Sequence, residues 1–162
     1  MRREITLNAE ATGTVRGLLE GRYYVAAQAV LEGLGLVASD VAQVVQDDTE
    51  LALLLAEPGR ITGKVIAERG SLPALSDARV AANWIDDDGE EIDPVTISEI
   101  ALAPDASFQF EGLFGLRRLQ LIGLPPEWRV QSIRQGRTEI ATTGVTVAAG
   151  ATVEIVITIG LR

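Results

Sequence analysis

The sequence of 162 residues predicts an all-β protein, an antiparallel β-sandwich in which one complete domain is preceded by a truncated copy. Roughly seven short runs of alternating apolar and polar residues follow one another at close spacing in the second part of the chain, a pattern typical of sandwiches. An apolar content of 47% is enough for a packed core. The stretch Glu4–Leu18 also aligns without gaps on Glu99–Leu113, which indicates that the chain is built from repeats.

The N-terminal copy begins with two predicted strands, Arg3–Ala9 and Gly13–Leu18, joined by a turn. A third strand is expected at Arg22–Ala26, whose aromatic and β-branched residues suit a pleated surface. Residues 39–47 remain open between a short helix and a strand, because Asp40 and Gln43 resemble a capping box.

The boundary between the two copies is predicted at Pro58-Gly59, a strong chain break. It follows the apolar run Leu51–Leu55, which we expect to be the last strand of the first copy. Residues 1–59 are therefore interpreted as a partial sandwich repeat that lacks its first strands, and residues 60–162 as a complete sandwich.

The complete copy begins with an expected strand at Arg60–Glu68. In the second strand Ala78, Val80, Ala82 and Trp84 share one face, so we expect Trp84 in the core. Further strands are predicted around 95–102, 108–110, 119–121, 128–130, 145–147 and 153–159.

The motifs of this copy resemble a known family. They are Gly63-x-Val65, Phe108-x-Phe110-x-Gly112-Leu113 and the run Gly123-Leu-Pro-Pro-Glu-Trp128-x-Val-x-Ser-Ile133-x-x-Gly-Arg137. The pattern is similar to the carboxypeptidase regulatory-like domains, Ig-like or transthyretin-like β-sandwiches that occur in tandem in large bacterial surface and periplasmic proteins. The resemblance implies a structural, adhesive or binding module without catalytic residues, located outside the cell, at the cell surface or in the periplasm.

The first copy has no counterpart to Arg60–Ala67 or Ala78–Ile85. An incomplete sandwich leaves unpaired backbone groups and apolar side chains, which is costly unless another strand fills the gap. We therefore expect a protein partner, either other copies of the chain or neighbouring repeats, with assembly of copies into a filament by donor-strand-like completion.

The composition argues against several other functions. A net charge of −9 with scattered basic residues disfavours nucleic acid. The chain contains no histidine and no cysteine, which excludes a serine triad based on histidine and leaves no thiolate ligand. No apolar run is long enough to cross a membrane, and no secretory h-region follows Met1-Arg2-Arg3. We expect neither an enzyme nor direct membrane insertion, and no cofactor apart from calcium.

Calcium is the alternative suggested by an acidic cluster around Gly89. The candidate ligands are Asp86, Asp87, Asp88, Glu90 and Asp93, whose carboxylates suit a hard cation. The competing interpretation, a solvated hairpin loop, is favoured because Asp-Gly is a common turn pair. A glycosidase pair of Asp87 and Glu90 is disfavoured because no aromatic residues nearby would form a pocket.

Two further groups of residues are candidate interaction sites. Tyr23 and Tyr24 lie on opposite faces of one strand, so one of them is a candidate for stacking on a carbohydrate, whereas Trp84 and Trp128 are expected in the core. The last strand carries Val153, Ile155, Val156 and Ile157, and at a sheet edge it would be a template for pairing with another chain. The alternative is a central strand.

Overall fold

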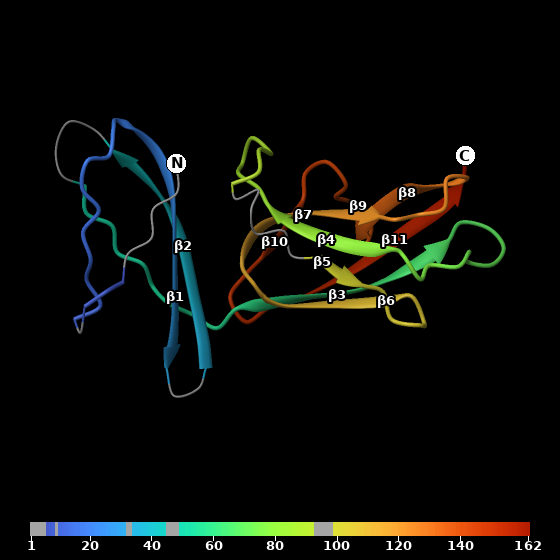
Figure 1. The fold of residues 1–162 in the computed structure, drawn as a ribbon, viewed down its shortest axis with the longest axis horizontal. Helices are drawn as coiled ribbons and strands as arrows, with labels where there is room; N and C mark the ends of the chain where they lie inside the picture. The colour runs from blue at the N-terminus through green and yellow to red at the C-terminus, as the bar shows by residue number, and fades with distance from the viewer. Residues whose placement is uncertain (1–5, 9, 32–33, 45–48, 93–98) are drawn as a thin grey trace.

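The fold is all-β, as predicted. The computed structural model describes residues 6–8, 10–31, 34–44, 49–92 and 99–162 (Figure 1). Within this part of the chain no helix is long and apolar enough to span a membrane. A two-stranded hairpin, β1 (Gly21–Leu31) and β2 (Leu34–Val44), stands apart from a β-sandwich that starts at Gly59.

The sandwich contains two sheets. One has the strand order β6-β3-β11-β8-β9 and the other β10-β7-β4-β5. The strands are β3 (Gly59–Ala67), β4 (Arg79–Trp84), β5 (Glu99–Ala101), β6 (Ser107–Leu113), β7 (Gly115–Ile122), β8 (Trp128–Gln135), β9 (Thr138–Glu139), β10 (Val145–Val147) and β11 (Thr152–Leu161).

The last strand, β11, is central. It pairs in parallel with β3 and antiparallel with β8, so both of its edges are occupied. Every other pairing in the sandwich is antiparallel. Over Val156–Ile159, where β11 has partners on both sides, its backbone groups are already paired within the sheet.

The core lies between the two sheets and follows the predicted alternation. Buried residues at every second position come from both sheets: Ile61, Val65, Val80, Ala82, Phe108, Phe110, Leu119, Val153, Ile155, Ile157 and Ile159. Gly63 lies on the core side of β3, where a Cβ atom would stand 2.2 Å from Cζ of Phe108. The ring therefore fits against β3 only because residue 63 has no side chain.

Three sequence-based expectations differ from the structure in the N-terminal part. Residues 6–8 and 10–20 form no strand, and neither do residues 51–55. The rest of the first predicted strand lies outside the described residues. Isolated extended segments gain no ladder hydrogen bonds, so apolar alternation alone does not make a strand of them.

Elsewhere the structure resolves alternatives that the sequence left open. Of residues 39–47, the part up to Val44 is strand, in β2, and the remainder lies outside the described residues. The predicted strand at Arg22–Ala26 is real but longer, because β1 continues to Leu31. Of the strand expected at 95–102, Glu99–Ala101 forms β5 and residues 95–98 lie outside the described part.

Candidate functional site

The acidic turn after β4 is closed by one of its own carboxylates. Oδ1 of Asp86 accepts hydrogen bonds from the backbone N–H groups of Asp88 (3.0 Å) and Glu90 (2.8 Å). These bonds, first of all the one from Glu90, lower the pKa of Asp86, because they stabilise the charged form. The aspartate therefore holds the shape of the hairpin loop.

The same turn contacts the N-terminal hairpin. The hydroxyl of Tyr24 donates to Oδ2 of Asp86 at 3.1 Å, and Nη2 of Arg22 lies 3.5 Å from Oδ2 of Asp87. The Arg22 guanidinium also lies over the Tyr24 ring, 5.2 Å from its centroid. Desolvation and the hydrogen bond to Asp86 raise the pKa of Tyr24. These four residues form a junction between the hairpin and the sandwich.

Of the predicted calcium ligands, four are described and Asp93 lies outside the described residues. Asp86 already accepts from two amides and a phenol, while Asp87 is directed to Arg22. Within the described part of the chain, no three acidic residues gather in a geometry that would hold a metal ion. The turn is also a contact surface for the hairpin.

The aromatic candidates separate in the structure. Tyr24 takes part in the junction, whereas the hydroxyl of Tyr23 donates locally to the carbonyl oxygen of Leu19 at 2.9 Å. Trp128 is partly buried against the core. Trp84 is also partly buried and meets Phe114 edge to face, with ring centroids 5.4 Å apart. Trp128 thus packs against the core as expected, whereas Trp84 lies beside Phe114 outside the core cluster, so its predicted place in the core is corrected.

The sequence interpretation missed a buried cation at this end of the sandwich. Arg117 is only 7% exposed, and its guanidinium lies 5.7 Å from the ring centroid of Trp84 and 5.5 Å from that of Phe114. Its Nε donates to the Phe114 carbonyl at 3.0 Å, and burial lowers its pKa to about 10. The alternation of Leu119 and Leu121 continues inward to position 117, a signal that was present in the sequence.

Asn83, in β4, is a second buried polar residue. Nδ2 of Asn83 donates to Oε1 of Glu91 at 2.7 Å, while its Oδ1 has no hydrogen-bond partner among the described residues. Nothing in the alternating pattern around Asn83 distinguished it from an exposed polar residue.

The interaction residues expected on the last strand are corrected by the structure. Val153, Ile155 and Ile157 are core residues, because β11 is central. Val156 is 42% exposed on the outer face of the sheet, but its backbone pairs with neighbours on both sides. The edge alternative for this strand is therefore wrong.

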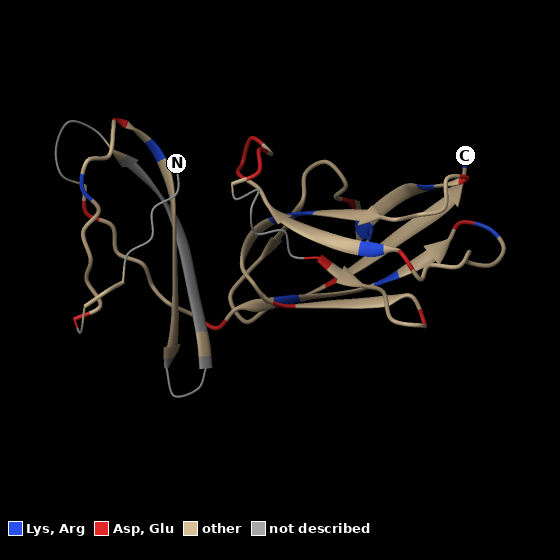
Figure 2. Ribbon diagram, viewed as in Figure 1, with Lys and Arg blue, Asp and Glu red and all other residues tan. Residues whose placement is uncertain are grey.

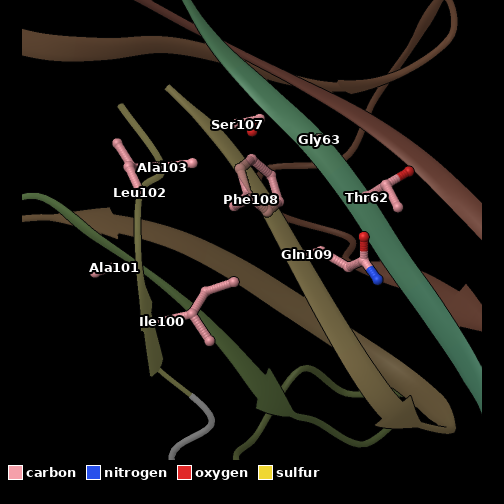
Figure 3. A pocket seen from close by; sticks show the side chains of 9 residues that line it. All are labelled: Thr62, Gly63, Ile100, Ala101, Leu102, Ala103, Ser107, Phe108 and Gln109. Carbon is pink, nitrogen blue, oxygen red and sulfur yellow. The ribbon is translucent and has the colours of Figure 1, made fainter. Parts of the chain in front are cut away.

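One groove opens between the free edges of the two sheets. It lies beside β5 and β6 and has a volume of about 420 Å³. Its lining includes Ile100, Leu102 and Phe108 together with backbone of β3 (Figure 3). No charged residue lines this groove.

In the N-terminal unit, residues 6–57, the side chains that the structure describes form no core. None of them is buried, and Gly59 is the first buried residue among those described. Val30 is 78% exposed and Leu54 is 91% exposed. Charged groups are scattered over the described part of the molecule, and β1 is uncharged along most of its length (Figure 2).

No protein-family model matches this sequence, and no curated protein matches it.

Proposed function

We propose that the chain is a non-catalytic structural or adhesive module that works by protein–protein association through its N-terminal unit. The observation that carries this proposal is the absence of buried residues among the described side chains before Gly59. Apolar surface left in water costs roughly 25 cal/mol per Å² relative to burial. Covering it on a partner is the simplest way to recover that free energy.

The shape of the surface favours a protein strand as the partner. An isolated two-stranded hairpin is marginally stable in water, and each of its outer edges presents unpaired N–H and C=O groups. Within the described residues, β1 and β2 pair only with each other. Addition of a further strand satisfies the backbone and covers side chains together.

The composition and the sequence resemblance support the rest of the proposal. Without histidine or cysteine, the chain lacks the usual general base and the usual nucleophile–base pairs. The resemblance to carboxypeptidase regulatory-like domains suggests a tandem module of a bacterial envelope or extracellular protein, and assembly into a filament.

The experiment is light scattering after size-exclusion chromatography over a range of concentrations, with electron microscopy of the same material. We expect concentration-dependent oligomers, and Val30→Lys on the hairpin to shift them toward monomer. Leu161→Lys is the control, because Leu161 is a comparably exposed apolar residue (63%) on the sandwich. A monodisperse monomer at every concentration contradicts the proposal.

A further inference from the structure

The two copies detected in the sequence share an unusual backbone conformation. Ala11 and Ala106, which the alignment pairs, both have positive φ, 57° and 63°. They are the non-glycine residues with positive φ in the described part of the chain. Left-handed backbone costs an alanine roughly 1–2 kcal/mol, so its recurrence at aligned positions is not expected by chance. The aligned glycines Gly17 and Gly112 also share a positive φ, 69° and 74°.

The turns around these alanines are closed by the same hydrogen bonds. In each copy the backbone N–H of the first turn residue donates to the carbonyl oxygen of the fifth, and the N–H of the fourth donates to the carbonyl oxygen of the first. In the first copy these bonds are Asn8 N–H to Thr12 O and Ala11 N–H to Asn8 O, both 3.0 Å. In the sandwich they are Ala103 N–H to Ser107 O and Ala106 N–H to Ala103 O, both 2.8 Å. The N-terminal unit therefore keeps the turn geometry of the complete sandwich.

The two copies differ in the segments on either side of the turn. In the sandwich the chain continues as β6, which pairs antiparallel with β3. In the first copy the aligned residues, Thr12–Val15, belong to no sheet. The segment before the turn behaves likewise, because β5 pairs with β4 whereas residues 6–8 form no strand.

Both segments are aligned with strands that pair with β3 or β4 in the sandwich. β3 and β4 are the strands that have no counterpart in the first copy. β3 also pairs with β11, whose counterpart at the end of the first copy is the run Leu51–Leu55, again without strand structure. These first-copy segments all have counterparts that pair with β3 or β4. At the spacing of the alignment β1 corresponds to β7, which also pairs with β4, but β1 is a strand because it pairs with β2.

We propose that Thr12–Val15 is an acceptor for one extended strand of the β3 type, bound antiparallel. This inference rests on the proposed function and names its partner. The register follows from the sandwich, where Ile61 faces Phe110 and Gly63 faces Phe108. Transferred to the first copy, the incoming strand places its Ile61 equivalent opposite Val15 and its Gly63 equivalent opposite Gly13.

The side chain opposite Gly13 defines the chemistry of the partner. In the sandwich the Phe108 ring occupies the space over Gly63. In the first copy the residue aligned with Phe108 is Gly13, which has no side chain to cover the partner strand. The best partner therefore carries a large apolar residue where β3 has Gly63, since a cross-strand aromatic covers a glycine.

The test adds synthetic peptides with the sequence of residues 58–68 to the full chain and follows amide hydrogen exchange. We expect the Gly63→Phe peptide to slow exchange within Thr12–Val15 by about tenfold or more, and more than the unchanged peptide does. A Gly63→Phe peptide that also carries Ile61→Asp and Val65→Asp is the control. No slowing at these residues, or equal slowing by the control, overturns the inference.

A graft gives the second measurement. A second copy of residues 59–98 is placed directly before Glu4, so that the first unit has its own β3 and β4. We expect protection within Thr12–Val15, and loss of that protection when Ile61→Asp and Val65→Asp are made in the grafted copy. A folded graft without protection at these residues also overturns the inference. If the graft protects Thr12–Val15 while the parent chain is monomeric at every concentration, the acceptor site stands and only the proposed assembly is contradicted.

Discussion

Tyr24 of the hairpin donates a hydrogen bond to Oδ2 of Asp86 in the acidic turn of the sandwich, 3.1 Å away. This bond joins the N-terminal hairpin to the sandwich. We expect Tyr24→Phe to loosen the junction without changing the thermal midpoint of the sandwich. Small-angle X-ray scattering should show a larger radius of gyration. Tyr23→Phe is the control, because its hydroxyl donates to the nearby Leu19 carbonyl, and identical curves for both variants contradict the role of Tyr24.

Glu139 should contribute to stability at neutral pH and lose that contribution in acid. Its carboxylate accepts from the backbone N–H of Ile133 (2.9 Å) and of Ala141 (3.3 Å), and these bonds lower its pKa below the ordinary 4.5. A depressed pKa in the folded state gives stability that is present above the unfolded value and is lost as pH falls through the folded one.

The measurement is the thermal midpoint of unfolding at pH 6 and at pH 2.5. The ordinary pKa of a carboxylate lies between these two pH values. We expect the midpoint of Glu139→Gln to fall less across this range than that of the parent chain. Glu154→Gln, on the exposed face of β11, should follow the parent. Equal losses in all three proteins would show that Glu139 contributes nothing.

Arg117 should tolerate a long apolar replacement better than a short one. Its side chain fills space between Trp84 and Phe114, so Arg117→Ala leaves a cavity and should cost about 2–4 kcal/mol. Arg117→Met keeps most of the volume and removes a desolvated charge, and should cost at least about 1 kcal/mol less. Urea unfolding at equilibrium measures both. A larger loss for Met than for Ala would mean that the charge itself stabilises this end of the sandwich.

The central position of β11 predicts opposite sensitivities at adjacent residues. Ile157 is fully buried, so Ile157→Ala should destabilise by about 2–5 kcal/mol. Val156 is on the outer face, and Val156→Ala should cost about 0.5 kcal/mol or less. Both values come from the same unfolding experiment, and similar costs would contradict the placement of β11 between β3 and β8.

Replacing Gly63 even by alanine should destabilise the sandwich. A Cβ atom would lie 2.2 Å from Cζ of Phe108 and 2.6 Å from the carbonyl oxygen of Ile155, so Gly63→Ala should destabilise by about 1–3 kcal/mol. Adding Phe108→Leu frees space, and the double variant should lose less than the sum of the single losses. Strict additivity in this double-mutant cycle would show that the two residues do not interfere.

The sequence alone predicted the strands of the sandwich because each carries its own evidence. In β3, β6 and β11, apolar residues at every second position face one core, and a slip of one residue would turn them all to water. The same local signal predicted Trp84 and Trp128 in the core, and only Trp128 packs against it. The alternating pattern also indicates that residue 117 faces inward, but we did not expect a charged residue such as Arg117 to be buried.

The pairing of strands was decided only in three dimensions. Leu51–Leu55 and Gly13–Leu18 have strand-like sequences, yet neither is a strand, because hydrogen bonds of a sheet belong to two segments at once. The position of β11 at the centre of its sheet depends on β3, which is far from it in sequence. Likewise, no local pattern joins Tyr24 to Asp86. The sequence determined which segments can be strands, and the tertiary structure decided which of them have a partner.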